Sequence, residues 1–322
     1  MLLQGILFCL GAAALYFGAE WLVRGSSRLA RSYGVSALVV GLTVVALGTS
    51  APELVVSTLA ALRGQGGVAV GNVVGSNILN LALIVGVAAL AGPLRVQMSL
   101  IFREAPLMVA AGLTLPLLAW DGVISRLDGA LLSLAFAGYL AFVVHSARRE
   151  PGSVKAEFAE FEAAEDRHPE RGTRLRDTGI AAAGLATLVV GAQLLVDAAV
   201  FFARAAGVSE VVVGLTVVAI GTSLPELATS AVASARGEAD IALGNVVGSN
   251  IFNSLIILGA ASLARPIGMD RSLFSYEVPV MVGISIVFPL LAYTRRTLGR
   301  LEGGFLVACY VAFTGFLLVR IG

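Results

Sequence analysis

The chain has 322 residues, of which 57% are hydrophobic and 13% are charged, and its formal net charge is +1. Its mean hydropathy is +0.90. A soluble protein normally has about 25% charged residues, so this composition excludes an ordinary soluble fold and indicates a protein of the lipid bilayer. Neither the net charge nor the distribution of basic residues favours nucleic acid as a partner.

The first half of the chain contains five apolar segments long enough to cross a bilayer. A membrane-spanning helix needs roughly 20 apolar residues. The segments are 2–23, 36–62, 68–91, 101–119 and 127–147. A polar stretch of mixed charge follows at 148–176. We interpret it as a solvated connector, because it is too short to form a separate domain.

The second half repeats the first at an offset of 173 residues, and its candidate spans are 177–203, 209–235, 241–264, 272–292 and 303–320. Because each half has an odd number of spans, two halves with one fold must enter the membrane from opposite sides. The predicted fold is therefore an all-α multi-pass membrane protein: ten helices form two inverted five-helix repeats, with interrupted helices at the midplane. The expected units are a first repeat at 1–147, a connector at 148–176 and a second repeat at 177–322.

Basic residues predict the orientation. Of the 22 Lys and Arg residues, 16 follow odd-numbered spans or lie in the connector, and six lie on the other side. Lys and Arg accumulate on the cytoplasmic side of membrane proteins. We therefore expect a cytoplasmic connector and both termini outside. Arginine outnumbers lysine 21 to 1, and Ala, Gly and Val are abundant, which is typical of a prokaryotic protein, so we expect a plasma (inner) membrane of a prokaryote.

The best-conserved part of the internal repeat lies inside two candidate spans. It reads GLTVVALGTSAPELVVS at 41–57 and GLTVVAIGTSLPELATS at 214–230. Pro52 lacks an amide hydrogen and Gly48 lowers helix stability, so the helix should be interrupted here. The interruption would free carbonyl groups such as that of Ala46, which must then face protein or a wet cavity.

Each copy of this motif carries one glutamate, Glu53 or Glu226, in strongly apolar sequence. A charge inside the bilayer is costly, and no basic residue lies in the same spans to pair with it. A bound cation is therefore the favoured explanation. Further oxygens come from the carbonyl of Ala219 and from the hydroxyl groups of Thr49, Ser50, Thr222 and Ser223.

A second segment repeats in the same register, as GNVVGSNILN at 71–80 and GNVVGSNIFN at 244–253. Its residues Ser76 and Asn80, and likewise Ser249 and Asn253, are four apart and share a helix face. The other asparagines, at 72, 77, 245 and 250, are expected to brace the backbone. Together the two segments predict an all-oxygen cage, which suits hard cations such as calcium and sodium better than zinc or copper.

Simpler structural roles compete at several positions. The motif glycines can kink or pack helices, and Ser76 and Ser249 can bond to carbonyl groups of their own helices. Glu20, near Arg24, and Glu104, next to Arg103, are interpreted as interfacial acids rather than ligands.

Together the motifs resemble the alpha-1 and alpha-2 repeats of the sodium/calcium exchanger branch of the calcium/cation antiporter superfamily, and the resemblance spans the chain. It implies a secondary antiporter, not an enzyme, that exchanges sodium for calcium electrogenically by alternating access and uses no cofactor. It also implies that the first and sixth helices slide against the other eight. The ion ligands that it implies are Glu53, Glu226, Thr49, Ser50, Ser76, Asn80, Thr222, Ser223, Ser249, Asn253, and the carbonyl groups of Ala46 and Ala219.

The resemblance also bears on ion selectivity. Some members, including the potassium-dependent exchangers, carry aspartate where Asn253 stands, so the amides at Asn80 and Asn253 imply that potassium is not transported. Protons can also neutralise the glutamates, so an antiporter of protons and calcium, or of another divalent cation such as magnesium, is the alternative. A channel, or an intramembrane hydrolase using Ser50 or Ser76, fits the sequence less well. Oligomeric state stays open, and a monomer can suffice.

Overall fold

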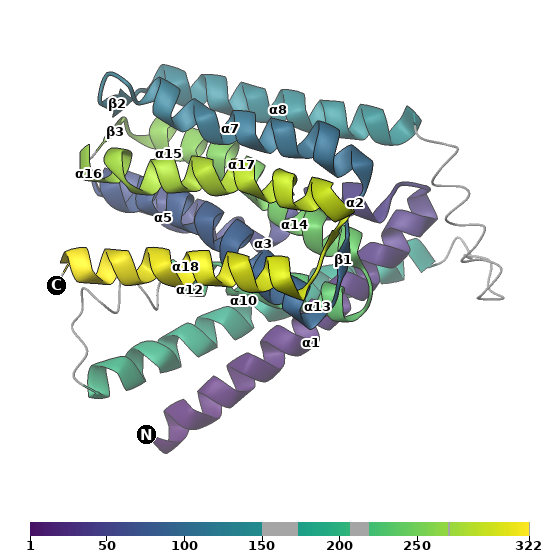
Figure 1. The fold of residues 1–322 in the computed structure, drawn as a ribbon. Coiled ribbons are helices and arrows are strands. Elements are labelled where there is room, and N and C mark those ends of the chain that lie inside the picture. The colour runs from purple at the N-terminus through teal and green to yellow at the C-terminus, as the bar shows by residue number, and fades with distance from the viewer. Residues whose placement is uncertain (150–172, 207–218, 270, 322) are drawn as a thin grey trace.

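Figure 1 shows the computed structural model of the chain, which describes residues 1–149, 173–206, 219–269 and 271–321. Nearly all of these residues are helical. Most of the predicted connector at 148–176, and the first part of the predicted span at 209–235, lie outside the described residues.

The first repeat consists of helices, three π-helical segments and two short strands. Its elements are α1 (Leu2–Tyr33), α2 (Ala37–Val40), the π-helical η1 (Gly41–Val45), α3 (Ala46–Thr49), α4 (Ala51–Leu62), α5 (Gly66–Ile78), the π-helical η2 (Leu79–Ile84), α6 (Val85–Ala91), β1 (Leu94–Arg95), the π-helical η3 (Leu100–Glu104), α7 (Ala105–Leu118), β2 (Val123–Ile124) and α8 (Arg126–Arg149).

The described part of the second repeat follows the same order. Its elements are α10 (Thr173–Ala205), α12 (Ala219–Thr222), α13 (Leu224–Ala235), α14 (Ala239–Phe252), the π-helical η5 (Asn253–Ile257), α15 (Leu258–Ala264), β3 (Ile267–Gly268), α16 (Arg271–Ser275), α17 (Glu277–Arg295), β4 (Thr297–Leu298) and α18 (Arg300–Ile321).

Nine of the ten predicted membrane spans correspond to apolar helices among the described residues. Among the described residues, eight helical stretches are long and apolar enough to cross a membrane, and a pair of helices bent by 46°, Ala37–Thr49 and Ala51–Leu62, brings the number to nine. These nine match predicted spans. The tenth, 209–235, is described only from Ala219 onward.

One predicted boundary was wrong by a wide margin. The first span was expected to end near residue 23, but α1 continues as a helix to Tyr33 and ends at Gly34, whose φ of 65° is left-handed. The end was expected there because the apolar segment stops at Arg24. A polar sequence can continue a helix until a residue such as glycine adopts the left-handed conformation that closes it.

The two repeats are inverted relative to each other. Strand β1 pairs with β4, and β2 pairs with β3, so that each two-stranded ribbon joins the two repeats. The ribbons lie at opposite ends of the helices (Figure 1). We call the end with β1, where α8 ends and α10 begins, the connector end. The other, where α1 begins and α18 ends, is the terminus end.

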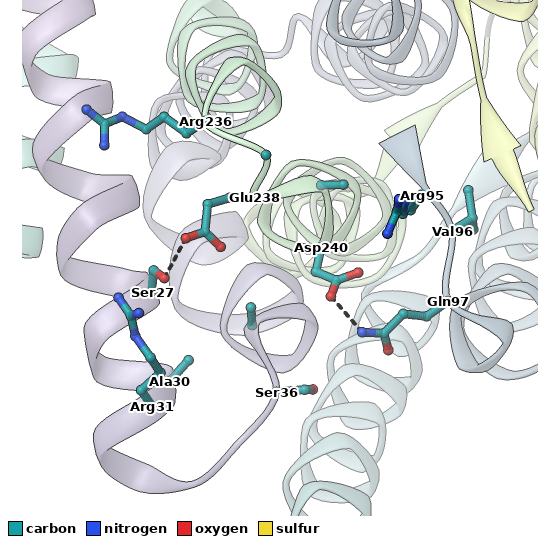
Figure 2. A pocket seen from close by; sticks show the side chains of 13 residues that line it. Ser27, Ala30, Arg31, Ser36, Arg95, Val96, Gln97, Arg236, Glu238 and Asp240 are labelled. Carbon is teal, nitrogen blue, oxygen red and sulfur yellow. Dashed lines mark hydrogen bonds between the residues drawn. The ribbon is translucent and has the colours of Figure 1, made fainter. Parts of the chain in front are cut away.

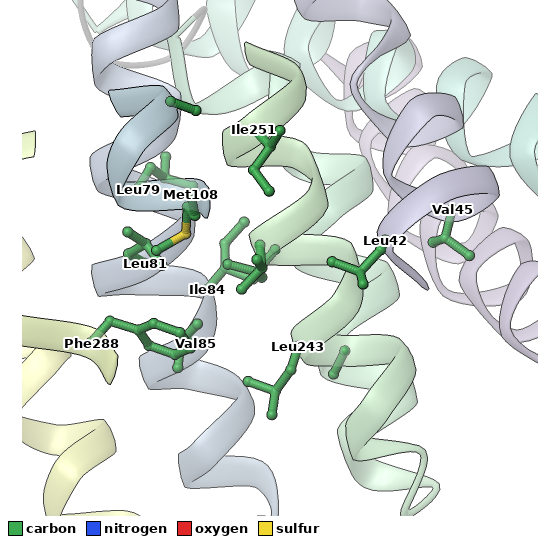
Figure 3. Close-up of a cluster of buried hydrophobic side chains, with 14 of the residues drawn as sticks. Leu42, Val45, Leu79, Leu81, Ile84, Val85, Met108, Leu243, Ile251 and Phe288 are labelled. Carbon is green, nitrogen blue, oxygen red and sulfur yellow. The ribbon is translucent and has the colours of Figure 1, made fainter. Parts of the chain in front are cut away.

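The helices that carry the repeated motifs lie at the centre. Within their most apolar windows, 94% of the residues in Ala239–Ala264 and 78% in Gly66–Ala91 are buried, against 22% in Leu2–Tyr33 and in Arg174–Ala205. Figure 3 shows side chains of the central helices packed together, among them Leu81, Ile84 and Leu243. This packing gives the motif residues a fixed frame.

Helices α1 and α10 form a separate antiparallel pair beside this frame (Figure 1). A Cβ atom on Gly18 would lie 2.8 Å from the carbonyl oxygen of Gly184, and one on Gly11 would lie 2.9 Å from that of Gly191. The two backbones are therefore in direct contact, as small residues allow in membrane helices. An ion pair between Arg28 and Asp177, at 3.6 Å, also links them.

The close contact predicts the effect of adding one methyl group to α10. A Cβ on Gly184 would overlap the backbones of Gly18 and Leu22, whereas one on Gly179 would have nothing within 4 Å. Overpacking of a tight contact costs about 1–3 kcal/mol. We expect Gly184→Ala to lower the midpoint of thermal unfolding in detergent and Gly179→Ala to leave it unchanged or raise it. Equal midpoints would contradict the contact.

Candidate functional site

Both motif helices are interrupted at a serine, as the sequence predicts. Helix α3 ends at Thr49, Ser50 has φ −83° and ψ 8°, and α4 begins at Ala51. The second motif repeats this at Ser223, with φ −92° and ψ 9°. The proline after each serine falls in the first turn of the new helix, where its missing N–H is tolerated.

The interruption places each glutamate in the first turn of a helix. Glu53 lies in the first turn of α4 and Glu226 in the first turn of α13. Backbone N–H groups at a helix start favour negative charge. Both glutamates are buried, each with 1% of its surface exposed.

Each glutamate is held by the serine of the other repeat. The hydroxyl of Ser223 donates to Oε1 of Glu53 over 2.8 Å, and the hydroxyl of Ser50 donates to Oε1 of Glu226 over the same distance. Further hydroxyl groups adjoin these serines: Ser76 lies 3.2 Å from Ser223, and Ser249 lies 2.9 Å from Ser50. The crossed contacts bring the two carboxylates, and the four serines, into one site.

The second oxygen of each carboxylate is buried without a donor. Oε2 of Glu53 and Oε2 of Glu226 have no hydrogen-bond partner. Among the described residues, the ion pairs of the structure involve neither glutamate. Buried polar atoms are nearly always satisfied, so this pair of acceptors calls for a positively charged partner from outside the chain.

Two buried amides add two further acceptors. Nδ2 of Asn80 donates to Oδ1 of Asn250 over 3.0 Å, and Nδ2 of Asn253 donates to Oδ1 of Asn77 over 3.1 Å. These bonds fix which way each amide points. The remaining oxygens, Oδ1 of Asn80 and Oδ1 of Asn253, have no donor.

The two predicted ligand amides lie in π-helical segments, Asn80 in η2 and Asn253 in η5. Such segments are often found at functional sites. Behind them, Nδ2 of Asn250 donates to the carbonyl of Asn77 over 3.2 Å, and Nδ2 of Asn77 donates to the hydroxyl of Ser254 over 2.9 Å. The network therefore joins both repeats.

Asn72 and Asn245 contact the backbone at the two glutamates, in line with the backbone role predicted for these asparagines. Nδ2 of Asn72 lies 3.5 Å from the carbonyl oxygen of Glu53, and Nδ2 of Asn245 lies 3.5 Å from that of Glu226. Sequence reasoning missed the serines that share these braces. Asn72 donates to Ser57 over 2.9 Å, and Asn245 donates to Ser230 over 3.1 Å. Both serines belong to the repeated motif, so the repeat itself could have identified them.

The two predicted threonine ligands have partners within the protein. The hydroxyl of Thr49 lies 3.1 Å from the carbonyl oxygen of Val45 and 3.0 Å from Oδ1 of Asn245. Thr222 lies 3.5 Å from Oδ1 of Asn72.

The two predicted carbonyl ligands differ from each other. The N–H of Ser50 donates to the carbonyl of Ala46 over 3.1 Å, whereas the N–H of Ser223 donates to Ile220 rather than to Ala219. The carbonyl oxygen of Ala46 also lies 3.5 Å from the hydroxyl of Thr49.

A cavity of about 780 Å³ reaches the second motif from the terminus end. It extends from Gln4 of α1 to Gly221 and Thr222, and it lies between α10 and the first turns of α4. At the connector end the corresponding seam is closed, because α1 packs directly against α13. The two halves of an internally symmetric molecule are therefore in different conformations.

The oxygen atoms of this site fit a hard cation. Four buried oxygen atoms without a donor come from two carboxylates and two amides, with seryl oxygens beside them. Calcium and sodium prefer oxygen ligands, and calcium accepts irregular arrangements of six to eight of them, at about 2.3–2.6 Å. The formal charge of the two carboxylates matches one calcium ion or two sodium ions.

Comparison with known proteins gives one consistent family. The family model described as "Sodium/calcium exchanger protein" matches residues 3–145 and 177–319. The chain is 39% identical over 320 residues to the inner membrane protein YrbG of Escherichia coli, covering 95% of this chain and 96% of that protein. It is 34% identical over 339 residues to the sodium/calcium exchanger MaX1 of Methanosarcina acetivorans, covering 96% of each.

The fold is also similar to a solved exchanger. A structure of the sodium-calcium exchanger NCX_Mj, soaked with 2.5 mM Na⁺ and 0.1 mM Ca²⁺, superimposes with a TM-score of 0.84 at 31% identity and covers 98% of both chains. The crystals soaked without either ion give the same TM-score, 0.84, at 32% identity.

The amide network predicts a positioning role for Asn250, which orients Asn80. We expect Asn250→Ala to weaken calcium binding by about 10-fold or more, as the loss of a residue that supports a metal ligand commonly does. The measurement is calcium-dependent stabilisation of the purified protein against thermal unfolding, with the exposed Gln65→Ala as control. An unchanged calcium titration in Asn250→Ala would remove this role.

Proposed function

The chain belongs to the sodium/calcium exchanger family, and we propose that it exchanges sodium for calcium across the membrane at the site between its two repeats. The family is one of transporters, so the chain is a membrane transporter rather than an enzyme and needs no cofactor. The names of MaX1 and NCX_Mj support sodium and calcium as its ions.

The observation that carries the proposal is the set of four buried acceptors without a donor, on Glu53, Glu226, Asn80 and Asn253. A cation neutralises the two buried carboxylates, and the two amide oxygens can ligate the same ion. We assign the transported ions to a larger set around them: Glu53, Glu226, Thr49, Ser50, Ser76, Asn80, Thr222, Ser223, Ser249, Asn253, and the carbonyl groups of Ala46 and Ala219.

Competition for these oxygens is the proposed basis of coupling. One calcium ion, or sodium ions in its place, neutralises the two carboxylates, and both cannot occupy the same oxygens at once. The empty site carries two bare charges, which would resist passage through the membrane interior. Only the loaded site then crosses readily between the two orientations.

The conformational asymmetry supports alternating access. The seam between α1 and α13 is closed, and a cavity separates α10 from α4. By the pseudo-symmetry of the repeats, the opposite state has the first seam open and the second closed. We propose that α1 and α10 slide as one unit against the other helices to interchange the two states.

The finer assignments follow from the sequence. We place the connector end in the cytoplasm and both termini outside, in a prokaryotic inner membrane, which agrees with the name of YrbG. The structure is then open to the outside. We also assign repeats to 1–147 and 177–322, joined by the connector at 148–176, and expect no transport of potassium because Asn80 and Asn253 are amides.

The glutamates supply the direct test. We expect Glu53→Gln and Glu226→Gln, made singly, to reduce sodium-gradient-driven calcium uptake in proteoliposomes to the level of liposomes without protein. Each change keeps the shape of the side chain and removes the charge that neutralises the ion. Glu302→Gln, outside the site in the first turn of α18, is the control and should transport normally. Full activity in either site variant would refute the proposal.

Ion dependence and voltage separate this function from its alternatives. If three sodium ions exchange for one calcium ion, one net charge moves, and 100 mV is worth about 2.3 kcal/mol for each charge. We expect uptake driven by internal sodium to proceed without potassium and to increase when the vesicle interior is made positive by a clamped potential. Calcium uptake driven by a pH gradient without sodium would instead identify a proton/calcium antiporter.

A further inference from the structure

The closed seam at the connector end is held by polar contacts that the open seam cannot reproduce. Glu20 of α1 is buried, with 8% of its surface exposed, and its carboxylate accepts two hydrogen bonds from Arg236 at the end of α13, one of them from Nε over 2.6 Å. Arg24 lies 2.5 Å from the same carboxylate. A bidentate arginine–carboxylate pair is among the stronger polar contacts in proteins.

A second contact crosses the same seam. The hydroxyl of Ser27, also on α1, donates to Oε1 of Glu238 over 2.8 Å. Figure 2 shows this bond between α1 and the loop that joins α13 to α14, at the wall of a cavity of about 500 Å³. This cavity is lined by residues of the connector end and not by the glutamates of the ion site.

The internal repeat identifies the counterparts of these residues at the terminus end. At the offset of 173 residues, Glu20 corresponds to Gln193, Ser27 to Val200, Arg236 to Arg63, and Glu238 to Gln65. The arginine is kept at the end of the motif helix, but the buried acid, the hydroxyl and the second acid are not. Closing the terminus end therefore cannot form the same contacts.

The open side of the molecule agrees with this difference. Gln193 is exposed and donates to Asp197 over 2.8 Å, and both line the cavity that separates α10 from α4. Arg63, which follows α4, is exposed. In the opposite state, Arg63 would approach Gln193, and the nearest acid on α10 would be one helical turn further along.

We propose that Glu20, Arg24, Arg236, Ser27 and Glu238 form a latch at one end only, which must open before the ion site is exposed to the connector end. The proposal rests on the alternating-access function above. The latch favours the state that is open at the terminus end, because the counterparts of Glu20, Ser27 and Glu238 cannot form the same contacts in the other state. Apparent ion affinity at the connector end is then lowered, since the competent state there is less populated.

An unsatisfied hydroxyl on the closed side gives an independent sign of this second state. Thr229 is fully buried on α13, and its Oγ1 has no hydrogen-bond partner. Its counterpart in the first repeat is Val56, which lines the open cavity. If the connector end opens as the terminus end has, Thr229 becomes exposed to water, and its hydroxyl can then form a hydrogen bond with water.

The two positions provide a matched pair of reporters. In a background of Cys9→Ala and Cys309→Ala, Val56→Cys and Thr229→Cys are made separately, and the rate of labelling by a small maleimide is measured on the purified full chain in detergent. We expect Val56→Cys to react faster than Thr229→Cys. Adding Glu20→Gln should raise the Thr229→Cys rate about fivefold and lower the Val56→Cys rate, since loss of one partner breaks the pair. Glu302→Gln is the control and should change neither rate.

A second variant adds contacts at the terminus end, so that the test does not depend on whether Glu20→Gln destabilises the fold. Gln193→Glu with Asp197→Arg copies the pattern of Glu20 and Arg24 onto exposed positions of α10, opposite Arg63. This double variant should also slow labelling of Val56→Cys and speed labelling of Thr229→Cys, and adding Arg63→Gln should cancel the effect.

Two outcomes can be told apart. If the rates stay the same in Glu20→Gln and in the double variant while sodium–calcium exchange is intact, the latch is refuted and the proposed function stands. If the wild-type chain shows no exchange in proteoliposomes, the proposed function fails, whatever the labelling rates show.

Discussion

The structure depends on placing two carboxylates in the interior of a membrane protein without a basic partner. Each repeat supplies one glutamate and the serine that holds the glutamate of the other repeat, so neither half can complete the site alone. The helix interruption at Ser50 and Ser223 is the local condition for this exchange, because it sets the hydroxyl and the carboxylate on either side of a bend. Desolvation makes the arrangement unfavourable unless a cation completes it. The desolvation cost of burying the two carboxylates therefore favours a bound cation.

Much of this could be predicted from the sequence because the repeat is so well preserved. The lengths of the apolar segments predicted the membrane spans, and Gly48 and Pro52 predicted the helix interruption. The odd number of spans in each repeat predicted that the repeats are inverted. What could not be predicted depends on contacts between distant positions. The orientation of Asn80 requires Asn250, and Ser254 has a leucine as its counterpart, so comparison of the halves does not reveal it. The predicted end of the first span was also too early, because α1 continues as a helix beyond the apolar segment.

Glu20 shows the same limit in another way. Its neighbour Arg24 suggested a simple interfacial pair, and that contact exists. The stronger partner, Arg236, is 216 residues away in the chain. Local reasoning about charge is reliable for pairs on one helix, but it misses a bidentate partner contributed by the end of another. Departures from the internal repeat then become informative, because symmetry fixes the frame and the substitutions at symmetric positions decide which state is favoured.

The glycine contact between α1 and α10 has a consequence for the tightness of the membrane. Since their backbones touch along several turns, a shift of α1 away from α13 carries α10 toward α4. In the proposed alternating-access cycle, one seam would open only as the other shuts, and steric contact would prevent a continuous water path through the molecule. The proposed exchanger would then lose no ion gradient through an open pore between transport cycles.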